Sequence, residues 1–403
     1  MSTPSRALDG IRVLDLTNVL AGPFCAYQLA LLGAEVIKVE VPDGGDLARQ
    51  LGADAELNAR HMGASFLAQN AGKKSITLNL KSDEGKTVLQ RLVETADVLV
   101  ENFRPGVMSR LRLAYADLQP INPRLVYCAI SGFGQDGPMK TVPAYDQIIQ
   151  GLSGMMSVTG TPENSPLRSG FPVADTLAGM TAAFAISSAL VRRGATGEGA
   201  FIDVSMLDSA LTAMGWAVSN YLIAGVEPKP HGNDNFTAAP SGAFRAKDGL
   251  INIAANKQEQ FEALVAAVGR EELASDPRFA LRESRKRHRA ELTRELEQAL
   301  GQRTCAEWQT VFNRIGVPAG CVLDVPQALA LPQIAHRGLL KRFDDAPGAD
   351  RPLTIARTGF KMSGGDPDVE SPPPILGQDT EAVLGSIGFS ADDLAHLKKA
   401  GAI

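Results

Sequence analysis

Strand-like and helix-like segments alternate along the first 130 residues, and this alternation restricts the fold more than any other feature of the chain. Short apolar runs rich in branched residues predict strands at 11–16, 35–40, 75–80, 97–101 and 124–130. Helices are predicted from the Gly22-Pro23 turn to Leu32 and over 84–94. Such alternation is typical of a parallel sheet with helical crossovers. The intervening segment 41–70 is interpreted as a long surface loop.

A second α/β unit is predicted later in the chain. Proline and glycine gather in 225–240, which is interpreted as a linker. The strand-like run 250–254 follows, and charged helical segments continue to about Leu329. A proline-rich run at 372–374 then precedes a short helical region at the C-terminus.

The composition excludes several classes of function. The 403 residues include 40 Lys and Arg against 45 Asp and Glu, and the formal charge of −5 argues against general binding to nucleic acid or anionic membranes. Four scattered cysteines and five histidines without ligand spacing support neither a disulfide framework nor a metal site. No signal-type region follows Met1, and the longest apolar helical run, 177–191, is too short to span a bilayer comfortably. A cytoplasmic, reduced protein is therefore predicted.

Asp175 is the only carboxylate in a stretch of otherwise small or apolar residues, and it directly precedes the helix-like run 177–191. At this place an Asp is a natural N-cap, because its oxygens accept the unpaired amides of the first turn. The positive end of the helix dipole then favours the charged carboxylate. A carboxylate with apolar neighbours is also a candidate nucleophile. The residue alone leaves both interpretations open.

Two further motifs fall near expected strand ends. Gly132-Phe133-Gly134-Gln135-Asp136-Gly137 matches GxGxxG, but Pro138 follows at once and no helix is expected there, so a loop lining some other site is favoured over a dinucleotide site. Asn102-Phe103-Arg104-Pro105-Gly106, with Arg110 and Arg112 beyond it, follows the strand 97–101, where open α/β sheets bind ligands. These groups suit a phosphate-bearing nucleotide, and the alternative is a Pro-Gly turn.

Together and in this order, these pieces resemble the class III CoA-transferase family, which includes formyl-CoA transferase and the related α-methylacyl-CoA racemases. The resemblance spans nearly the whole chain. The matching segments are Leu8–Asp15, Ala21-Gly22-Pro23, Leu32–Glu40, Asn102–Gly106, Gly132-Phe133-Gly134, Asp175 with Gly179, Gly197-Glu198-Gly199, Asp203–Met206 and Gly316–Gly320.

The resemblance implies a role for Asp175. In transferases of this family the matching residue is the nucleophile, which forms a mixed anhydride and then an aspartyl-CoA thioester. Coenzyme A or acyl-CoA is then a substrate, and no cofactor is bound permanently. Carried over by position, the residues of the CoA site are Leu20, Ala21, Asn70, Ala71, Gly72, Lys73, Asn102, Phe103, Arg104, Arg110 and Tyr145.

The same resemblance leaves the exact reaction open. The racemases carry a His where this chain has Tyr145, which favours a transferase acting on an acyl-CoA, such as succinyl-CoA, and a small carboxylic acid. Formyl-CoA transferase has Gln where this chain has Leu20, so formate-oxalate exchange is not implied. A racemase or epimerase, and a non-catalytic CoA-binding paralogue, are the alternatives.

The family fold is a Rossmann-like open sheet formed by both chain ends, with a smaller α/β domain inserted between them. It implies a large domain begun by 1–224, a small domain with its linker at 225–329, and a return segment at 330–403 that completes the large domain. Two such chains are expected to interlock as a homodimer.

Overall fold

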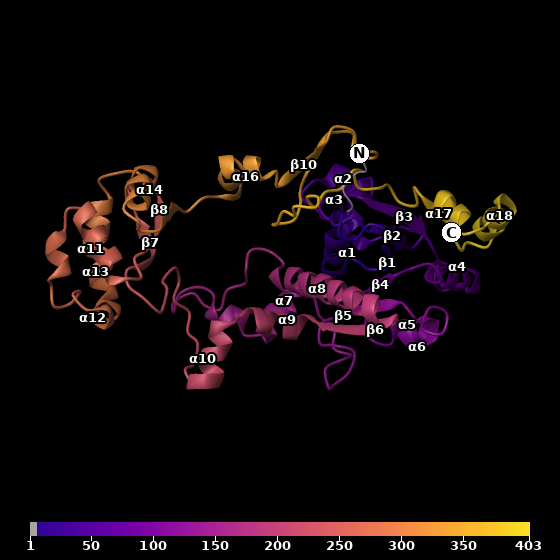
Figure 1. Ribbon diagram of the computed structural model, residues 1–403, viewed down its shortest axis with the longest axis horizontal. Coiled ribbons are helices and arrows are strands. Elements are labelled where there is room, and N and C mark those ends of the chain that lie inside the picture. The colour runs from indigo at the N-terminus through magenta and orange to yellow at the C-terminus, as the bar shows by residue number, and fades with distance from the viewer. Residues whose placement is uncertain (1–5) are drawn as a thin grey trace. The chain divides into compact units, whose positions relative to one another are not determined.

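The computed structural model describes residues 6–403, which form two compact units (Figure 1). The large unit consists of the chain up to Met155 together with Arg168–Val226 and Ala335–Ile403, and the small unit of Met156–Leu167 and Glu227–Ile334. The sequence had placed 156–167 in the large domain. This segment instead packs with the small unit, where the N–H of Gly232 donates to the carbonyl of Gly160 at 2.7 Å.

The large unit contains the predicted parallel sheet. Six strands lie in the order β3-β2-β1-β4-β5-β6, and all neighbours run parallel. Its four inner strands, β2, β1, β4 and β5, are almost entirely buried, as expected for a sheet covered on each side by helices. The strands are β1 (Arg12–Asp15), β2 (Glu35–Glu40), β3 (Lys73–Thr77), β4 (Val98–Glu101), β5 (Val126–Ser131) and β6 (Ala200–Ser205).

Strand order reverses at β1, which pairs with β2 on one side and with β4 on the other. Val13 and Leu14 of β1 are aligned with Val98 and Leu99 of β4, so both strands end at the same edge of the sheet. Open α/β sheets bind their ligands in the crevice beyond the carboxyl ends of the strands at such a reversal. The topology alone therefore indicates where a site lies.

Helices cover both faces of the sheet (Figure 1). One face carries α1 and α8, and the other carries α4, α17 and α18. The helices of the large unit are α1 (Ala21–Leu31), α2 (Ala55–Ala59), α3 (Ala64–Leu67), α4 (Asp83–Val93), α5 (Val107–Leu111), α6 (Tyr115–Leu118), α7 (Asp146–Leu152), α8 (Val173–Thr196), α9 (Met206–Ala213), α10 (Trp216–Ala224), α17 (Thr380–Ser386) and α18 (Ala391–Lys399).

Helix α8 has 24 residues, more than the run 177–191 predicted. By length and composition alone it would suffice to cross a membrane. Its Ala178, Ala182 and Ile186, however, are buried in the core that α1 and the sheet share. A Cβ at Gly179 would lie 2.6 Å from the carbonyl oxygen of Ala21, so only glycine allows α8 to approach the start of α1 this closely.

The prediction that 41–70 is a surface loop is wrong. This segment forms the single-turn helix η1 (Leu47–Gln50) and then α2 and α3, and it buries Ala48, Met62 and Phe66 in a small core that it shares with the C-terminal segment. Two of its charged residues, Asp46 and Arg49, are buried as well, because each pairs with a buried charged side chain of β2. Arg49 donates to both oxygens of Glu40 at 2.7 and 2.8 Å and stacks on Phe66.

The C-terminal segment returns to the large unit. Its β10 (Leu340–Phe343) and β11 (Leu353–Ala356) form an antiparallel pair, and Tyr27 of α1 donates to the carbonyl of Ala356 at 2.9 Å. Farther along, Asp379 and Thr380 accept hydrogen bonds from backbone N–H groups of the edge strand β3. The C-terminal segment is therefore part of the large unit.

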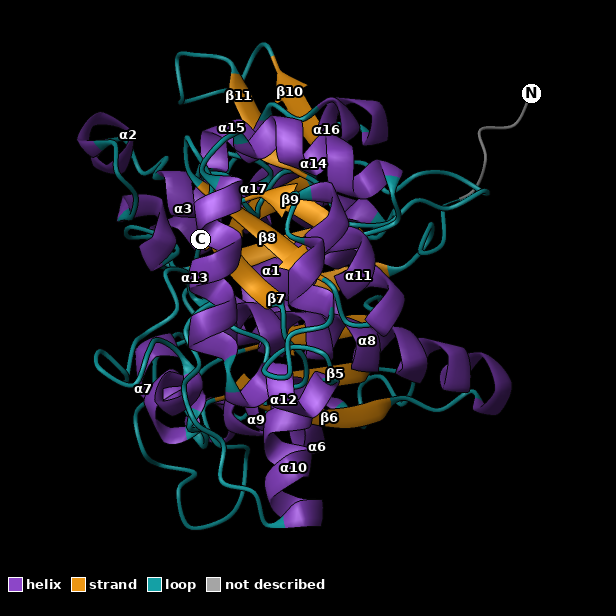
Figure 2. Cartoon of the chain, turned by 90° about the vertical axis from the view of Figure 1, so that its left-hand side faces the viewer, coloured by secondary structure: helices purple, strands orange, loops and turns teal. Residues whose placement is uncertain are grey.

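The small unit has a three-stranded antiparallel sheet of β7 (Ser241–Arg245), β8 (Leu250–Ala254) and β9 (Ala319–Cys321) (Figure 2). Its core joins apolar side chains of this sheet with Phe261, Trp308 and Phe312 of the helices. The remaining elements are η2 (Met155–Val158), α11 (Gln258–Ala267), η3 (Glu271–Ala274), α12 (Arg282–Arg287), α13 (Arg289–Leu300), α14 (Cys305–Arg314), α15 (Val325–Leu329) and α16 (Pro332–Arg337), which leads back to the large unit.

Buried ion pairs support the sheet close to where its strand order reverses. Asp15 at the end of β1 lies 2.8 Å from the ammonium of Lys73 and 3.9 Å from that of Lys38, and all three side chains are inaccessible to solvent. Burial alone would raise the pKa of Asp15, but the two lysine charges and the hydrogen bond from Lys73 outweigh it and hold that pKa at about 2.

Lys73→Met is expected to lower the free energy of unfolding by about 3–5 kcal/mol, because it leaves the buried Asp15 without its nearest cation. Urea unfolding measures the loss. Lys74→Met is the matched control, since Lys74 is exposed and pairs with Glu35 at 2.6 Å. It should cost less than about 1 kcal/mol. Equal losses in the two variants would contradict this account of the pair.

Candidate active site

A cavity of about 350 Å³ lies at the carboxyl edge of the sheet, beyond the reversal between β1 and β4. Its walls come from the loops after β1, β4 and β5 and from the starts of α8 and α9. Asp175 is the only carboxylate among its lining residues. The lining residues are Asn18, Val19, Leu20, Ala21, Leu47, Asn102, Phe103, Arg104, Pro105, Ile130, Ser131, Gly132, Lys140, Val142, Pro143, Ala144, Tyr145, Asp175 and Met206.

Asp175 is not an N-cap. Helix α8 begins at Val173, three residues earlier than the cap interpretation requires, and Asp175 lies inside its first turn. The cap comes from another helix instead. Oδ1 of Asp146, at the start of α7, accepts from the N–H groups of Ala174 and Asp175 at 2.8 and 3.4 Å. Oδ2 of Asp146 accepts from Nε2 of Gln150 at 2.6 Å, which keeps this carboxylate turned toward α8.

The position of Asp146 has an electrostatic consequence. Burial raises the pKa of Asp175 to about 7, and the neighbouring charge of Asp146 adds to the effect. The prediction that the helix dipole keeps Asp175 charged therefore does not describe the net result. No salt bridge joins Asp175 to any cation within residues 6–403. The result is a carboxylate of high basicity in a largely desolvated cavity.

A second wall is the loop that joins β1 to α1. Asn102 fixes this loop through two hydrogen bonds of 2.8 Å, since its Oδ1 accepts from the N–H of Asn18 and its Nδ2 donates to the carbonyl of Asn18. Helix α1 begins at Ala21, and no side chain caps it. Within the described chain the N–H groups of Leu20 and Ala21 have no acceptor, and both residues line the cavity.

The glycine-rich loop after β5 forms a third wall. No helix begins at this motif, since the next helix, α7, starts at Asp146. The hydroxyl of Ser131 accepts from the N–H of Gly134 at 3.0 Å, and Asp203 accepts from the N–H of Gln135 at 2.8 Å. These bonds fold the loop back, so that Gly132 lines the cavity.

The structure gathers only part of the predicted CoA site. Leu20, Ala21, Asn102, Phe103, Arg104 and Tyr145 line the cavity together with Asp175. The others do not line it: Asn70, Ala71, Gly72, Lys73 and Arg110. Lys73 is withdrawn into the sheet, where its ammonium bonds Asp15 and the carbonyl of Pro23.

Sequence reasoning missed Asp146, Lys140 and Leu47. Asp146 gave the clearer signal, because a carboxylate at the first position of a helix interacts favourably with backbone N–H groups. Its partner, however, is the start of α8 rather than its own helix, and nothing in the local sequence identifies that partner. Lys140 and Leu47 reach the cavity through the folding of loops whose ends alone were predictable.

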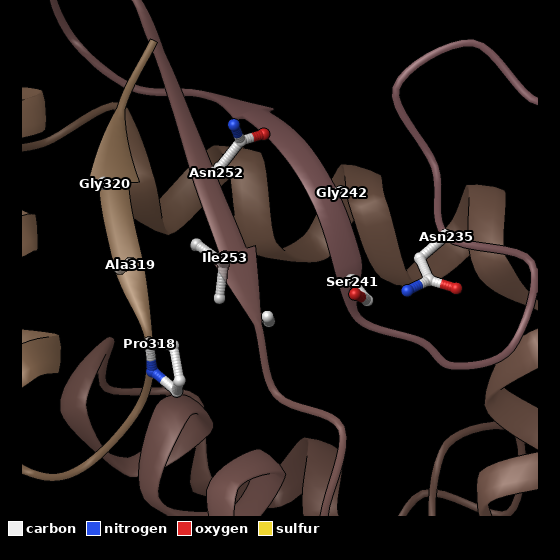
Figure 3. A pocket seen from close by; sticks show the side chains of 9 residues that line it. Asn235, Ser241, Gly242, Asn252, Ile253, Pro318, Ala319 and Gly320 are labelled. Atoms are coloured by element: carbon white, nitrogen blue, oxygen red, sulfur yellow. The ribbon is translucent and has the colours of Figure 1, made fainter. Parts of the chain in front are cut away.

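A second cavity, of about 420 Å³, lies in the small unit beside its sheet (Figure 3). Figure 3 shows the amides of Asn235 and Asn252 and the hydroxyl of Ser241, with Ile253 and Pro318 as apolar neighbours. No titratable side chain lines this cavity. It therefore lacks a group for acid-base or carboxylate chemistry, and the Asp175 cavity is the better candidate. Among residues 6–403 no group of three His, Cys, Asp or Glu side chains is placed to hold a metal ion.

Comparison with known proteins agrees with the geometry. A family model for CoA-transferase family III matches residues 8–380. The acetyl-CoA:oxalate CoA-transferase of Acetobacter aceti is 41% identical over 354 residues, which cover 88% of this chain and 90% of that protein. The succinyl-CoA:glutarate CoA-transferase of Mus musculus is 35% identical, over 95% of this chain and 86% of that protein.

A solved structure resembles the whole chain. The crystal structure of a CAIB/BAIF family protein from Brucella suis superposes with a TM-score of 0.83 at 36% identity, covering 95% of this chain and all of the other. The likeness first indicated by scattered motifs therefore extends over the sequence and the fold alike. The chain belongs to CoA-transferase family III.

Proposed function

We propose that this enzyme moves coenzyme A from an acyl-CoA donor to a small dicarboxylic acid, with Asp175 as the group that is acylated. The observation that carries the proposal is the state of Asp175: a largely buried carboxylate that makes no ion pair among residues 6–403 and lines a cavity together with Leu20 and Ala21, whose N–H groups are unbonded within those residues. A buried carboxylate without a counter-ion costs stability at neutral pH, so its place is explained by chemistry rather than by folding.

The reaction is a chain of acyl exchanges in which every leaving group is used. The Asp175 carboxylate attacks the thioester carbonyl of the donor, the C–S bond breaks, and a mixed anhydride and CoA thiolate form. The thiolate attacks the aspartyl carbonyl, which gives an aspartyl-CoA thioester and releases the donor acid. The acceptor carboxylate then attacks this thioester and expels the thiolate, which attacks the acceptor carbonyl and regenerates Asp175. No net proton is taken up or released.

The electrostatics of the site suit this sequence. A carboxylate with a raised pKa is a stronger nucleophile than an ordinary one, and a desolvated cavity keeps water from hydrolysing the anhydride. Each attack places negative charge on a carbonyl oxygen. The unbonded N–H groups of Leu20 and Ala21, at the positive end of α1, are suited to receive that oxygen.

The cavity is too small for the whole of CoA. Its size suits the acyl group and the adjoining end of the CoA chain. We assign this end to the Asn102, Phe103, Arg104 and Tyr145 wall, and the phosphate-bearing part to the exposed surface near Arg110. In this proposal CoA is a substrate and no cofactor stays bound. A cytoplasmic location remains a prediction.

The choice of a dicarboxylic acceptor rests on two observations. The relatives named above act on oxalate and on glutarate. In this chain Arg104 and Lys140 line the cavity, and within the described residues neither makes an ion pair. One of them is therefore free to hold the second carboxylate of an acceptor while the first reacts. Succinyl-CoA is the donor we propose.

A racemase remains the second candidate, and one observation weighs against it. Tyr145 lines the cavity where a racemase would carry a histidine, and none of the lining residues is a histidine. Proton exchange at the α-carbon needs an acid-base pair, and Asp175 alone does not supply one. Deuterium uptake into an acyl-CoA without any acceptor acid would favour the racemase.

We also propose that the chain acts as a homodimer, interlocked as in its family. Apolar side chains are exposed on the outer face of α8, with Phe184 at 74% and Val191 at 78% accessibility, and on α10, with Trp216 at 72% and Ile223 at 85%. Large exposed apolar patches of this kind mark protein interfaces. The connectivity is compatible with linked rings, because both chain ends build one unit around an inserted one.

Asp175→Asn is expected to reduce transfer from succinyl-CoA to a panel of dicarboxylic acids by at least about a thousandfold, because the amide is not a nucleophile. Mass spectrometry after hydroxylamine trapping should find a modified Asp175 in the wild-type protein only. Asp208→Asn is the matched control, since Asp208 also lies in the first turn of a helix but is exposed and outside the cavity. Full transfer activity in Asp175→Asn would exclude the proposed mechanism.

The pH dependence should follow the raised pKa. With a value of about 7 in the free enzyme, kcat/KM is expected to fall about tenfold per pH unit on the acid side of pH 7, because only the carboxylate attacks. Asp146→Asn removes a neighbouring negative charge, so the acid limb should move to lower pH. Asp208→Asn should leave the limb in place. An acid limb that stays unchanged in Asp146→Asn would contradict the assignment.

The raised pKa of Asp175 also predicts how the stability of the protein depends on pH. Asp175 has a pKa of about 7 in the folded protein and its ordinary pKa of about 3.8 when unfolded, so the carboxylate destabilises the fold as pH rises through that window. Asp175→Asn is therefore expected to raise Tm at pH 8 relative to the wild type and to leave it nearly unchanged at pH 4. A Tm gain of equal size at both pH values would show that repacking, rather than charge, is responsible.

Phe184→Glu is expected to weaken the dimer, because it places a charge at the centre of the exposed apolar face of α8. Analytical ultracentrifugation of the wild-type chain should give twice the mass of one chain, with more monomer in the variant. Leu281→Glu, at a side chain that is 70% exposed in the small unit, is the control and should leave the mass unchanged. A monomeric wild-type protein would overturn the dimer proposal.

A further inference from the structure

Val19, in the loop that forms one wall of the Asp175 cavity, has a backbone conformation that its side chain disfavours. Its φ is +68°, in the left-handed region, where a β-branched residue is an outlier. The other described non-glycine residues with positive φ are His61, Arg112 and Asp350, and none is β-branched. Such a conformation persists only where the surrounding structure enforces it, and it is found mainly at functional sites.

Two buried side chains hold both backbone polar groups of Val19. Its N–H donates to Oδ1 of Asp46 at 2.9 Å, and its carbonyl accepts from Nε2 of Gln69 at 2.8 Å. Asp46 is 1% exposed and Gln69 is 5% exposed. Both belong to the segment 41–70, far along the chain from Val19. The strain is therefore imposed from outside the loop.

Asp46 is itself fixed in place. Its Oδ1 also accepts from the N–H of Ala48 at 2.9 Å, and its Oδ2 lies 2.9 Å from the ammonium of Lys38. Its own N–H donates to Glu40 at 3.0 Å. With these bonds in place, the carboxylate cannot turn away from Val19 without breaking other buried contacts.

The residues on either side of Val19 show what the strained turn achieves. Asn18 is held by Asn102, so the chain enters Val19 in a fixed direction. The chain then continues into Leu20 and Ala21, whose N–H groups are unbonded within the described chain and which line the cavity. Because φ and ψ of Val19 set the orientation of the next peptide plane, they also set the direction of the Leu20 N–H.

We propose that Asp46 and Gln69 are positioning residues, which hold Val19 in the left-handed conformation so that the N–H groups of Leu20 and Ala21 face the carbonyl oxygen of the group transferred at Asp175. The inference rests on the proposed function. It explains why a valine tolerates this conformation, and why a charged and an amide side chain are buried beside this loop.

Gln69→Leu tests the proposal, because it removes the bond to the Val19 carbonyl and leaves the buried charges intact. It is expected to lower kcat on the order of tenfold to a hundredfold, with KM for the acyl-CoA little changed, since the lost interaction forms only in the transition state. Adding Val19→Gly should restore most of the rate, because glycine adopts this φ without help. A residue with a merely structural role gives no such rescue.

Asn122→Leu is the matched control. Nδ2 of Asn122 also donates to two backbone carbonyls, those of Val93 and Ala96, at 2.9 and 2.7 Å, but the residue lies outside the cavity. This variant and Gln69→Leu should lose similar amounts of Tm, whereas kcat per folded molecule should fall only in Gln69→Leu. An unchanged kcat in Gln69→Leu, or a loss that Val19→Gly does not reverse, would overturn the positioning role.

Single-turnover mass spectrometry separates this proposal from the proposed function. If the wild-type protein forms no adduct at Asp175 with succinyl-CoA or other acyl-CoA donors, the proposed function fails, and the catalytic role of the turn fails with it. If the wild-type adduct forms and appears equally fast in Gln69→Leu, only the positioning role fails. Slow formation in Gln69→Leu and fast formation in the double variant support both.

Discussion

The reversal of strand order between β1 and β4 is the constraint on which the rest of the site depends. The chain leaves these neighbouring strands toward opposite faces of the sheet, and the space beyond their carboxyl ends is left for a ligand. Asn18 and Asn102 join the two loops that leave this edge by a pair of hydrogen bonds of 2.8 Å. Helix α8 then brings Asp175 to the same space, and Gly179 allows the close approach.

Two carboxylates of the large unit, Asp15 and Asp175, show how the fold shifts the pKa of the same kind of group in opposite directions. Asp15 lies between Lys38 and Lys73, and these charges keep its pKa low despite complete burial. Asp175 lies near the charge of Asp146 and makes no ion pair within residues 6–403, so burial and repulsion raise its pKa to about 7. The first arrangement suits a permanent ion pair and the second a reactive group. The difference lies entirely in the neighbours that the fold supplies.

The sequence predicted what depends on local pattern. Alternating apolar runs predicted the parallel sheet, and an isolated carboxylate in an apolar stretch singled out Asp175. Contacts between distant segments were not predictable in this way. The cap of α8 comes from Asp146 on another helix, and Asp46 and Arg49 are buried because each pairs with a charged side chain of β2. Lys73 was expected at the CoA site because of the family resemblance, yet it pairs with Asp15 inside the sheet.

The buried charges beside the Val19 turn need an explanation other than stability. A buried ion pair often makes a protein no more stable than apolar residues of the same size would. Apolar side chains, however, cannot hold a backbone group in a chosen direction. Asp46 accepts from the N–H of Val19, Glu40 from the N–H of Asp46, and Arg49 donates to the carbonyl of Pro374. Each charge is therefore tied to a backbone group as well as to its counter-ion. Directional support of the loops around the cavity accounts for a network that packing alone would not require.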